Sequence, residues 1–220
     1  MIAVISADLL NSSGYSHTLL EKVLHVLKLE FDILKESGSD FRIYRGDSFQ
    51  GILKNPEEAL RVVLKIKTAI NQLDESDLSN KRNMAIKADM KCAIGIGTYD
   101  FERESIAEAN GQAFQFSGRT LDSMKTLNRK TQLKTPVEAV NEEFNTSLFL
   151  FDTLADKWST ASAEVIYYLL KGLKETEIAE ELDISQSAVN QRKKAAGWEA
   201  INALLLRYEK VISEHFSNGK

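Results

Sequence analysis

The first 140 residues alternate between apolar strand-like runs and helical patterns of apolar positions, and this alternation predicts a mixed α+β fold. Apolar or alternating runs indicate strands, and apolar residues three and four positions apart indicate amphipathic helices. The pattern predicts strands at 1–7, 40–45, 48–53, 85–97 and 132–136, and helices at 16–36, 56–73 and 113–127. The order βαββαβ, followed by another helix and strand, is typical of a ferredoxin-like, palm-type domain.

The pattern changes after Pro136, where 137–145 is acidic and loosely patterned before an apolar helix from Leu148 to Trp158. Further helical patterns follow at 160–171, at 174–182 and from Ser185 onward. We therefore divide the chain into a ferredoxin-like domain at 1–140, a linker helix at 141–157 and an all-α helix-turn-helix domain at 158–220.

The segment 174–194 has the spacing of a helix-turn-helix, with Ser185 as the N-cap of its second helix. Its interior positions are apolar or small: Ile178, Ala179, Leu182, Ile184 and Val189. The first helix is acidic and the second is basic, so only the second suits DNA. The candidate DNA contacts are Ser185, Gln186, Ser187, Asn190, Gln191, Arg192, Lys193 and Lys194. The alternative is a solvated basic face that contacts proteins.

Beyond Gly197, apolar residues recur every three or four positions and form one helical seam. The seam consists of Trp198, Ile201, Leu205, Tyr208, Ile212 and His215. It predicts either a homodimer that presents two recognition helices to DNA or intramolecular packing on the helix at 160–171.

Composition bounds the class of protein. The 220 residues are 43% hydrophobic and 27% charged, which suits one well-buried domain and a smaller one. The net charge of −4 excludes a protein that coats nucleic acid indiscriminately. The single cysteine, Cys92, lies in an apolar strand and predicts a core residue. Because no signal peptide or apolar stretch of about twenty residues is present, we expect a cytoplasmic protein without membrane contact.

Two aspartates carry the strongest chemical signal. Asp8 follows the apolar run 1–7, and Asp47 lies in the turn between the strands at 40–45 and 48–53. If these strands are neighbours, the two carboxylates converge and favour a shared hard cation such as Mg2+. The alternatives are that Asp8 caps the following helix and that Asp47 only makes a turn.

The residues after Asp8 are small and polar and precede a helix, so their backbone N–H groups predict a phosphate site. The candidate nucleotide contacts here are Leu9, Asn11, Ser12, Ser13 and Gly14, with Gly46 in the hairpin turn. A polyphosphate across this loop would share its charge with the metal.

With Asp8, Gly46-Asp47 and the strand 93–97, the first 140 residues resemble the catalytic domain of class III nucleotide cyclases. The resemblance extends to Gly111, Gln115 and Arg119, which occupy the register of the family's glycine, asparagine and arginine. It implies that Arg119 stabilises charge on the reacting phosphate and that Gln115, in place of asparagine, orients the ribose across a dimer interface. It also implies a phosphate contact for Lys130.

In overall layout the chain resembles the SatD family of bacterial proteins, with a similar Gly-Asp-x-Phe-Gln-Gly hairpin and a trailing helix-turn-helix. Our leading hypothesis is a homodimeric bacterial transcriptional regulator that senses a nucleoside triphosphate and Mg2+ and acts on DNA. The rival hypothesis is an active nucleotidyl cyclase, a phosphorus–oxygen lyase, or a related phosphoryl-transfer enzyme. A third is a palm domain that serves only for dimerisation.

Overall fold

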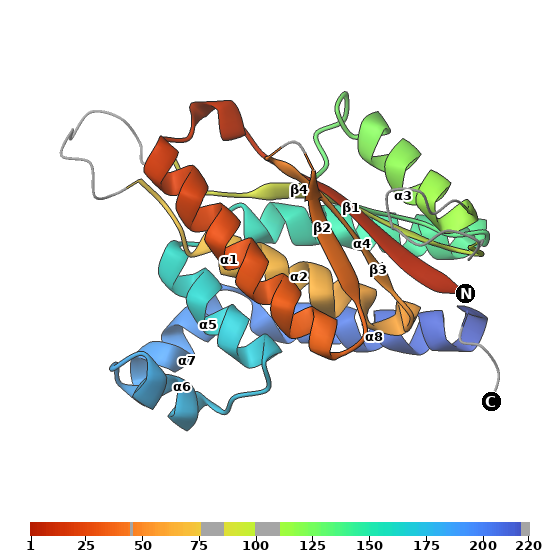
Figure 1. Ribbon diagram of the computed structural model, residues 1–220. Coiled ribbons are helices and arrows are strands. Elements are labelled where there is room, and N and C mark those ends of the chain that lie inside the picture. The colour runs from red at the N-terminus through yellow and green to blue at the C-terminus, as the bar shows by residue number, and fades with distance from the viewer. Residues whose placement is uncertain (45, 76–85, 100–110, 217–220) are drawn as a thin grey trace.

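The structure is a computed structural model that describes residues 1–44, 46–75, 86–99 and 111–216 (Figure 1). The polar stretch at 74–83, between the expected helix 56–73 and the expected strand 85–97, is predicted to be a loop, and most of it lies outside these residues. The strands are β1 (Ile2–Leu9), β2 (Asp40–Tyr44), β3 (Ser48–Leu53), β4 (Met90–Gly97) and β5 (Thr131–Lys134). The helices are η1 (Ser12–Gly14), α1 (His17–Glu36), η2 (Pro56–Glu58), α2 (Ala59–Asn71), α3 (Gln112–Ser123), α4 (Glu138–Ala155), α5 (Thr160–Leu170), α6 (Glu175–Glu181), α7 (Gln186–Ala195) and α8 (Trp198–Phe216).

The five strands form one sheet in the order β2-β3-β1-β4-β5. All neighbouring strands are antiparallel except β4 and β5, which are parallel. Side chains alternate between the two faces of β1, as the pleat requires. Ala3, Ile5, Ala7 and Leu9 enter the main core, whereas the Ser6 hydroxyl donates to Ser117 of α3 at 3.0 Å on the other face. Position 8 therefore shares the α3 face of the sheet.

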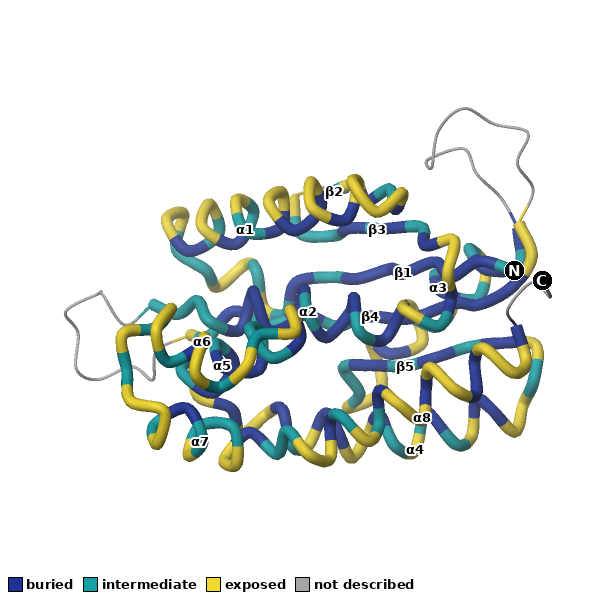
Figure 2. Tube along the Cα trace, turned by 90° about the horizontal axis from the view of Figure 1, so that it is seen from below, coloured by how far each residue is buried: buried dark blue, intermediate teal, exposed yellow. Residues whose placement is uncertain are grey.

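Helices cover the two faces unequally (Figures 1 and 2). The helices α1 and α2 pack on the main-core face, and α3 packs on β1, β4 and β5 of the other face. Glycine permits the close approach of α3, because a Cβ at Gly95 would lie 2.3 Å from the Ala113 carbonyl oxygen. On the α3 face of β2 and β3, Arg42, Tyr44, Ser48 and Gln50 keep partial or full exposure.

Three sequence-based boundaries were wrong. Asp8 lies inside β1 rather than after its end. The strand expected from residue 85 begins at Met90, because the Ala88 N–H donates to the Leu73 carbonyl at 2.9 Å instead of joining the sheet. The linker helix expected at 141–157 is α4, which begins earlier, at Glu138 in the acidic stretch, and buries Val140 and Phe144.

The C-terminal helices share a core with the sheet. The seam residues Ile201, Leu205, Tyr208 and Ile212 are buried within the chain, where α8 packs on α4, α2 and η2. The Tyr208 hydroxyl donates to the Pro56 carbonyl at 3.1 Å. The seam residues therefore pack within the chain, against α4, α2 and η2 instead of the expected α5. The three-part domain division stays a prediction.

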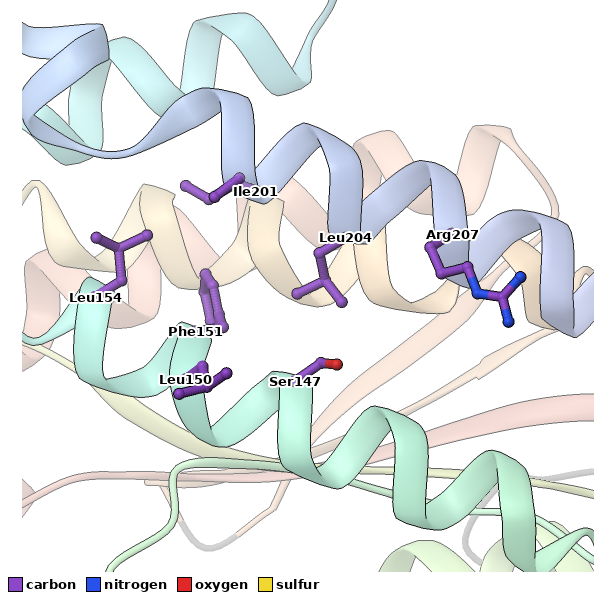
Figure 3. Close-up of a pocket in the computed structure, with 8 residues that line it drawn as sticks. Ser147, Leu150, Phe151, Leu154, Ile201, Leu204 and Arg207 are labelled. Carbon is purple, nitrogen blue, oxygen red and sulfur yellow. The ribbon is translucent and has the colours of Figure 1, made fainter.

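A shallow apolar groove runs along the outer side of the α4–α8 packing (Figure 3). Leu150, Leu154 and Leu204 line it, and Arg207 closes one end through a 2.7 Å ion pair with Glu143. The groove lacks converging polar groups and does not suit a nucleotide. Among the described helices, none is both long and apolar enough to cross a membrane.

Candidate metal and nucleotide site

The pairing of β1 with β3 brings the two sequence-predicted carboxylates to one edge of the sheet. Asp8 lies directly opposite Ser48, and the Leu9 N–H donates to the Asp47 carbonyl at 2.8 Å. Directly opposed residues project on the same face with Cβ atoms about 5 Å apart. The Ser48 hydroxyl in turn donates to Asp47 Oδ1 at 3.3 Å. Ser48 therefore lies next to both carboxylates.

The Asp8 carboxylate has no hydrogen bond or ion pair with any other described residue, although Asp8 is half-buried. Lys91 lies opposite it on β4, but the Lys91 ammonium donates to the Met124 carbonyl at 3.4 Å. Asp122 raises the pKa of the exposed Lys125 through a hydrogen bond, and Asp8 adds the smallest of the contributions. Asp8 thus offers an available anionic oxygen close to the end of α3.

The chemistry of these donors fits a small hard cation. Mg2+ binds through one or two carboxylates and completes its shell with water and phosphate oxygens. Asp8 and Asp47 supply that number, and Asp47 is oriented by Ser48 and by the Ser12 hydroxyl, which donates to Oδ2 at 3.0 Å. No cluster of three or more histidine, cysteine or acidic side chains exists within the described ranges. The site therefore suits a metal that arrives with phosphate, not an all-protein cage.

The loop after β1 differs from the expected helix N-terminus. Asn11 adopts a left-handed conformation and starts the short helix η1, so Ser12 reaches Asp47. At the start of α1, the Ser16 N–H donates to Glu75 at 2.7 Å and the Ser16 hydroxyl accepts from the Leu19 N–H. A carboxylate at this helix end disfavours phosphate there. The expected anion site at the N-terminus of α1 is thus already occupied by the chain's own groups.

A buried ion network, missed by the sequence analysis, lies beside this loop. Asp89 forms ion pairs with Lys67, which is only 2% exposed, and with Lys130 at 2.9 Å. Asn71 also donates to Asp89 at 3.1 Å. Burial opposes ionisation of Asp89, but Lys67 and Lys130 outweigh it and hold the pKa well below its usual range. Lys67, Asp89 and Lys130 are far apart in sequence, so only the fold reveals this network.

The network fixes the loop and engages the predicted phosphate ligand Lys130. The Leu10 N–H donates to the Asp89 carbonyl at 2.8 Å, and the Asp89 N–H donates to the Tyr15 hydroxyl at 3.1 Å. Lys130 also pairs with Asp156 at the end of α4. A phosphate at Lys130 would therefore compete with two carboxylates of the chain.

The remaining predicted nucleotide contacts are divided in space. Gly46 has φ +80°, the left-handed conformation that its hairpin turn requires. Gln115 and Arg119 lie one helical turn apart on the exposed side of α3. Neither side chain is bonded to another described residue, and Ala113 and Ser117 occupy the buried side. Arg119 and Gln115 are therefore presented to solvent.

The predicted DNA-contacting helix α7 follows Ser185, whose hydroxyl accepts from the Ala188 N–H at 3.2 Å. Gln186, Ser187, Gln191 and Lys194 are exposed. However, Arg192 pairs with Glu164 at 3.4 Å, and Lys193 pairs with Glu175 and Glu199 at 3.1 Å each. Asn190 donates to Glu175 at 3.3 Å. Two of the three basic residues are thus partly neutralised by the chain itself.

The chain matches no protein-family model, and no curated protein is similar to it in sequence. It is similar to the structure of a bacterial light-regulated adenylyl cyclase, with 14% identity, a TM-score of 0.40 and coverage of 60% of this chain and 74% of that chain. It is also similar to the catalytic core of a rhodopsin-guanylyl cyclase, with 16% identity, a TM-score of 0.39 and coverage of 56% of this chain and 71% of that chain. The similarity to the guanylyl cyclase Cya2 has 14% identity, a TM-score of 0.36 and coverage of 56% of this chain and 69% of that chain. These TM-scores are too low to transfer an activity or a site residue.

Proposed function

We propose that the chain binds a nucleoside triphosphate together with Mg2+ at the sheet edge formed by β1, η1 and the β2–β3 turn. This proposal rests on the observation that Asp8 and Asp47 both lie next to Ser48. A half-buried carboxylate without a partner is costly unless a cation reaches it. Metal-bound phosphate supplies that cation and suits the oxygen donors present.

In this proposal each residue has a distinct role. Asp8 and Asp47 would hold the metal, which supplies Lewis-acid polarisation of a phosphoryl oxygen when bound. Ser12 and Ser48 hold the Asp47 carboxylate in place through their hydroxyl groups. The residues Leu9, Asn11, Ser13 and Gly14 would border the phosphates, with Gly46 allowing the hairpin to turn beside them.

We further propose that turnover, as a nucleotidyl cyclase on a palm-type domain, requires a second copy of the chain. Gln115 and Arg119 face outward on α3. In a homodimer that pairs the α3 faces, Arg119 would stabilise charge on the phosphate held by the partner's carboxylates. Its guanidinium is suited to this role because it is charged at all working pH values and forms paired hydrogen bonds.

Equilibrium binding of the four nucleoside triphosphates with and without Mg2+ tests the first step. We expect Mg2+-dependent binding that Asp8→Asn and Asp47→Asn each weaken by at least about tenfold, since each removes a charged metal ligand. Asp40→Asn, at the far end of the hairpin, is the matched control and should bind as the unaltered chain does. Binding that is indifferent to Mg2+ or to both variants would refute the metal site.

Product formation with each triphosphate separates an enzyme from a sensor. Loss of product in Arg119→Ala, with nucleotide binding retained, would support cyclase chemistry. The mixture of Arg119→Ala and Asp47→Asn chains should regain activity, because a mixed dimer contains one intact site. Binding without product from any triphosphate would favour sensing.

A second candidate function is DNA binding through α7. The Ser185 cap and the exposed Gln186, Ser187, Gln191 and Lys194 favour it. Trp158 connects the two halves: its carbonyl accepts from Lys87 at 2.9 Å, and its indole N–H donates to the Ala196 carbonyl at the end of α7. Ligand-dependent movement near Lys87 would thereby reach α7. Fluorescence anisotropy with random duplex DNA, and with Lys194→Gln as the variant, tests this function.

A further inference from the structure

A polar groove of about 390 Å³ opens beside the candidate metal site, between the β1–η1 connection, the start of β4 and the α3–β5 connection. This volume lies within the range of small-molecule sites, about 300–1,000 Å³. The groove is lined by Leu10, Asn11, Ile86, Lys87, Asp89, Lys91, Asn128, Arg129, Lys130 and Asp156. Four of these side chains are cationic and two are carboxylates, so the lining carries an excess of positive charge.

The cations divide into a paired and an unpaired set. Lys130 is bonded to both carboxylates, Asp89 and Asp156. In contrast, Lys87 and Lys91 donate to backbone carbonyl groups, at 2.9 Å and 3.4 Å, and neither forms an ion pair with another described residue. A neutral carbonyl does not compensate a full positive charge. Lys87 and Lys91 therefore keep their positive charges available at the groove.

Arg129 is held in place without a carboxylate partner in the part of the chain that the structure describes. Its guanidinium carbon lies 3.6 Å from the centre of the Phe149 ring, a cation–π contact that fixes the plane of the group. Its Nη1 is buried and has no hydrogen-bond partner. An oriented guanidinium with a free N–H edge is well suited to a phosphate oxygen.

Lys87 shows the electrostatic consequence of this arrangement. Burial lowers its pKa; Lys67 and Lys130 also lower it, while Asp89 and Asp156 act in the opposite direction. Lys87 therefore binds its proton less tightly in the empty chain than in water. A bound anion would reverse that effect.

We propose that this groove is a metal-independent binding site for an oligophosphate anion, held by Lys87, Lys91 and Arg129. The site is independent of the proposed function, because it requires neither Asp8 nor Asp47. Its ligand is the phosphate end of a nucleotide or a free oligophosphate, which share the chemistry that Arg129 and the two lysines recognise. A ligand at Lys87 would also lie next to the hydrogen bond that Lys87 donates to the Trp158 carbonyl.

Calorimetry with sodium pyrophosphate and inorganic triphosphate, in the presence of a chelator that removes divalent metal, tests the site on the full chain. We expect saturable binding that Arg129→Gln and Lys91→Gln each weaken by about tenfold or more. Lys54→Gln, an exposed residue after β3 at the far end of the sheet, is the charge-matched control and should leave binding unchanged. Thermal unfolding of each variant verifies that it is folded.

Asp8→Asn separates this site from the proposed function. We expect the variant to lose Mg2+-dependent nucleotide binding but to keep pyrophosphate binding. The site is refuted if the unaltered chain binds no oligophosphate, if both folded groove variants bind normally, or if Asp8→Asn abolishes pyrophosphate binding. In a second arm, ATP and GTP binding tenfold tighter than inorganic triphosphate identifies a nucleotide, and equal affinities identify a free oligophosphate.

Discussion

The sheet edge and helix α7 both carry charged residues that suggest function, but only the sheet edge leaves them available. Within the described ranges, Asp8, Lys91 and Arg129 form no ion pair. On α7, by contrast, Arg192 is paired with Glu164, and Lys193 with Glu175 and Glu199. A ligand at the sheet edge gains uncompensated charges, whereas DNA at α7 must first displace carboxylates. The difference favours nucleotide chemistry over DNA binding as the principal function.

Two aspartates at the sheet edge, Asp89 and Asp8, show the same contrast between paired and unpaired charge. Asp89 is enclosed by Lys67, Lys130 and Asn71, whereas the Asp8 carboxylate, near the end of β1, has no ion pair or hydrogen bond with another described residue. We interpret Asp89 as a residue that stabilises the fold and Asp8 as a residue kept for a ligand. Removal of each charge should therefore have opposite consequences for stability and binding.

The largest expected effect is that of Asp89→Asn on stability. The variant leaves the buried Lys67 without its counter-charge, so we expect the free energy of unfolding to fall by about 3–5 kcal/mol. Asp8→Asn, the matched substitution, should change it by no more than about 0.5 kcal/mol. Urea unfolding at pH 7 measures both. Equal losses in the two variants would contradict the distinction between them.

Acid should reveal the same ion network in the unaltered chain. The pKa of Asp89 is lowered in the folded state, so the unfolded chain binds more protons at this position, and stability rises with pH through that range. The contribution is complete above the unfolded pKa of about 3.9 and is lost as pH falls below it. Urea unfolding between pH 7 and pH 3 should therefore show a smaller difference between the unaltered chain and Asp89→Asn at the acidic end.

The salt dependence of DNA binding should reveal the neutralisation of α7. Each phosphate contact adds about 0.9 to the slope of log affinity against log salt concentration. We expect the triple variant Glu164→Gln, Glu175→Gln, Glu199→Gln to raise this slope by about one to two, because it frees Arg192 and Lys193 from their ion pairs. Lys194→Gln should lower it by about one. Anisotropy across salt concentrations measures the slopes, and unchanged values would remove α7 from DNA binding.

The smallest expected effect is the loss of the α7 cap. Ser185→Ala removes the acceptor for the Ala188 N–H, which should reduce the free energy of unfolding by about 1 kcal/mol. Ser16→Ala removes the corresponding cap of α1 and should reduce it by a similar amount. Urea unfolding of the two variants compares the helices. A loss above about 3 kcal/mol at Ser185 would indicate a role beyond capping.

The sequence predicted the elements well where local pattern determines them. The order βαββαβ, the hairpin at Asp47 and the N-cap Ser185 follow from periodicity and cap chemistry. The start of α4 was placed too late because Val137 precedes it without a side-chain cap, although Val140, Phe144 and Leu148 have helical spacing. The start of β4 was misplaced because alternation continues beyond the residues that join the sheet.

The site was predicted only in part, for a physical reason. Asp8 and Asp47 could be found because each lies near a strand end that local pattern reveals. The network around Asp89 and the pairing of Arg192 with Glu164 depend on residues brought together by the fold. Composition gives the number of charges, but only tertiary structure determines which of them remain unpaired.

The central claim is that Asp8 and Asp47 share one metal ion with phosphate. Electron paramagnetic resonance titration of Mn2+, used in place of Mg2+, in the presence of saturating nucleoside triphosphate tests it most directly. Asp8→Asn and Asp47→Asn should each weaken Mn2+ binding by at least about tenfold, and the double variant should lose less than the combined losses, because ligands of one ion are coupled. Unchanged Mn2+ binding in either single variant, or fully additive losses, would contradict the claim.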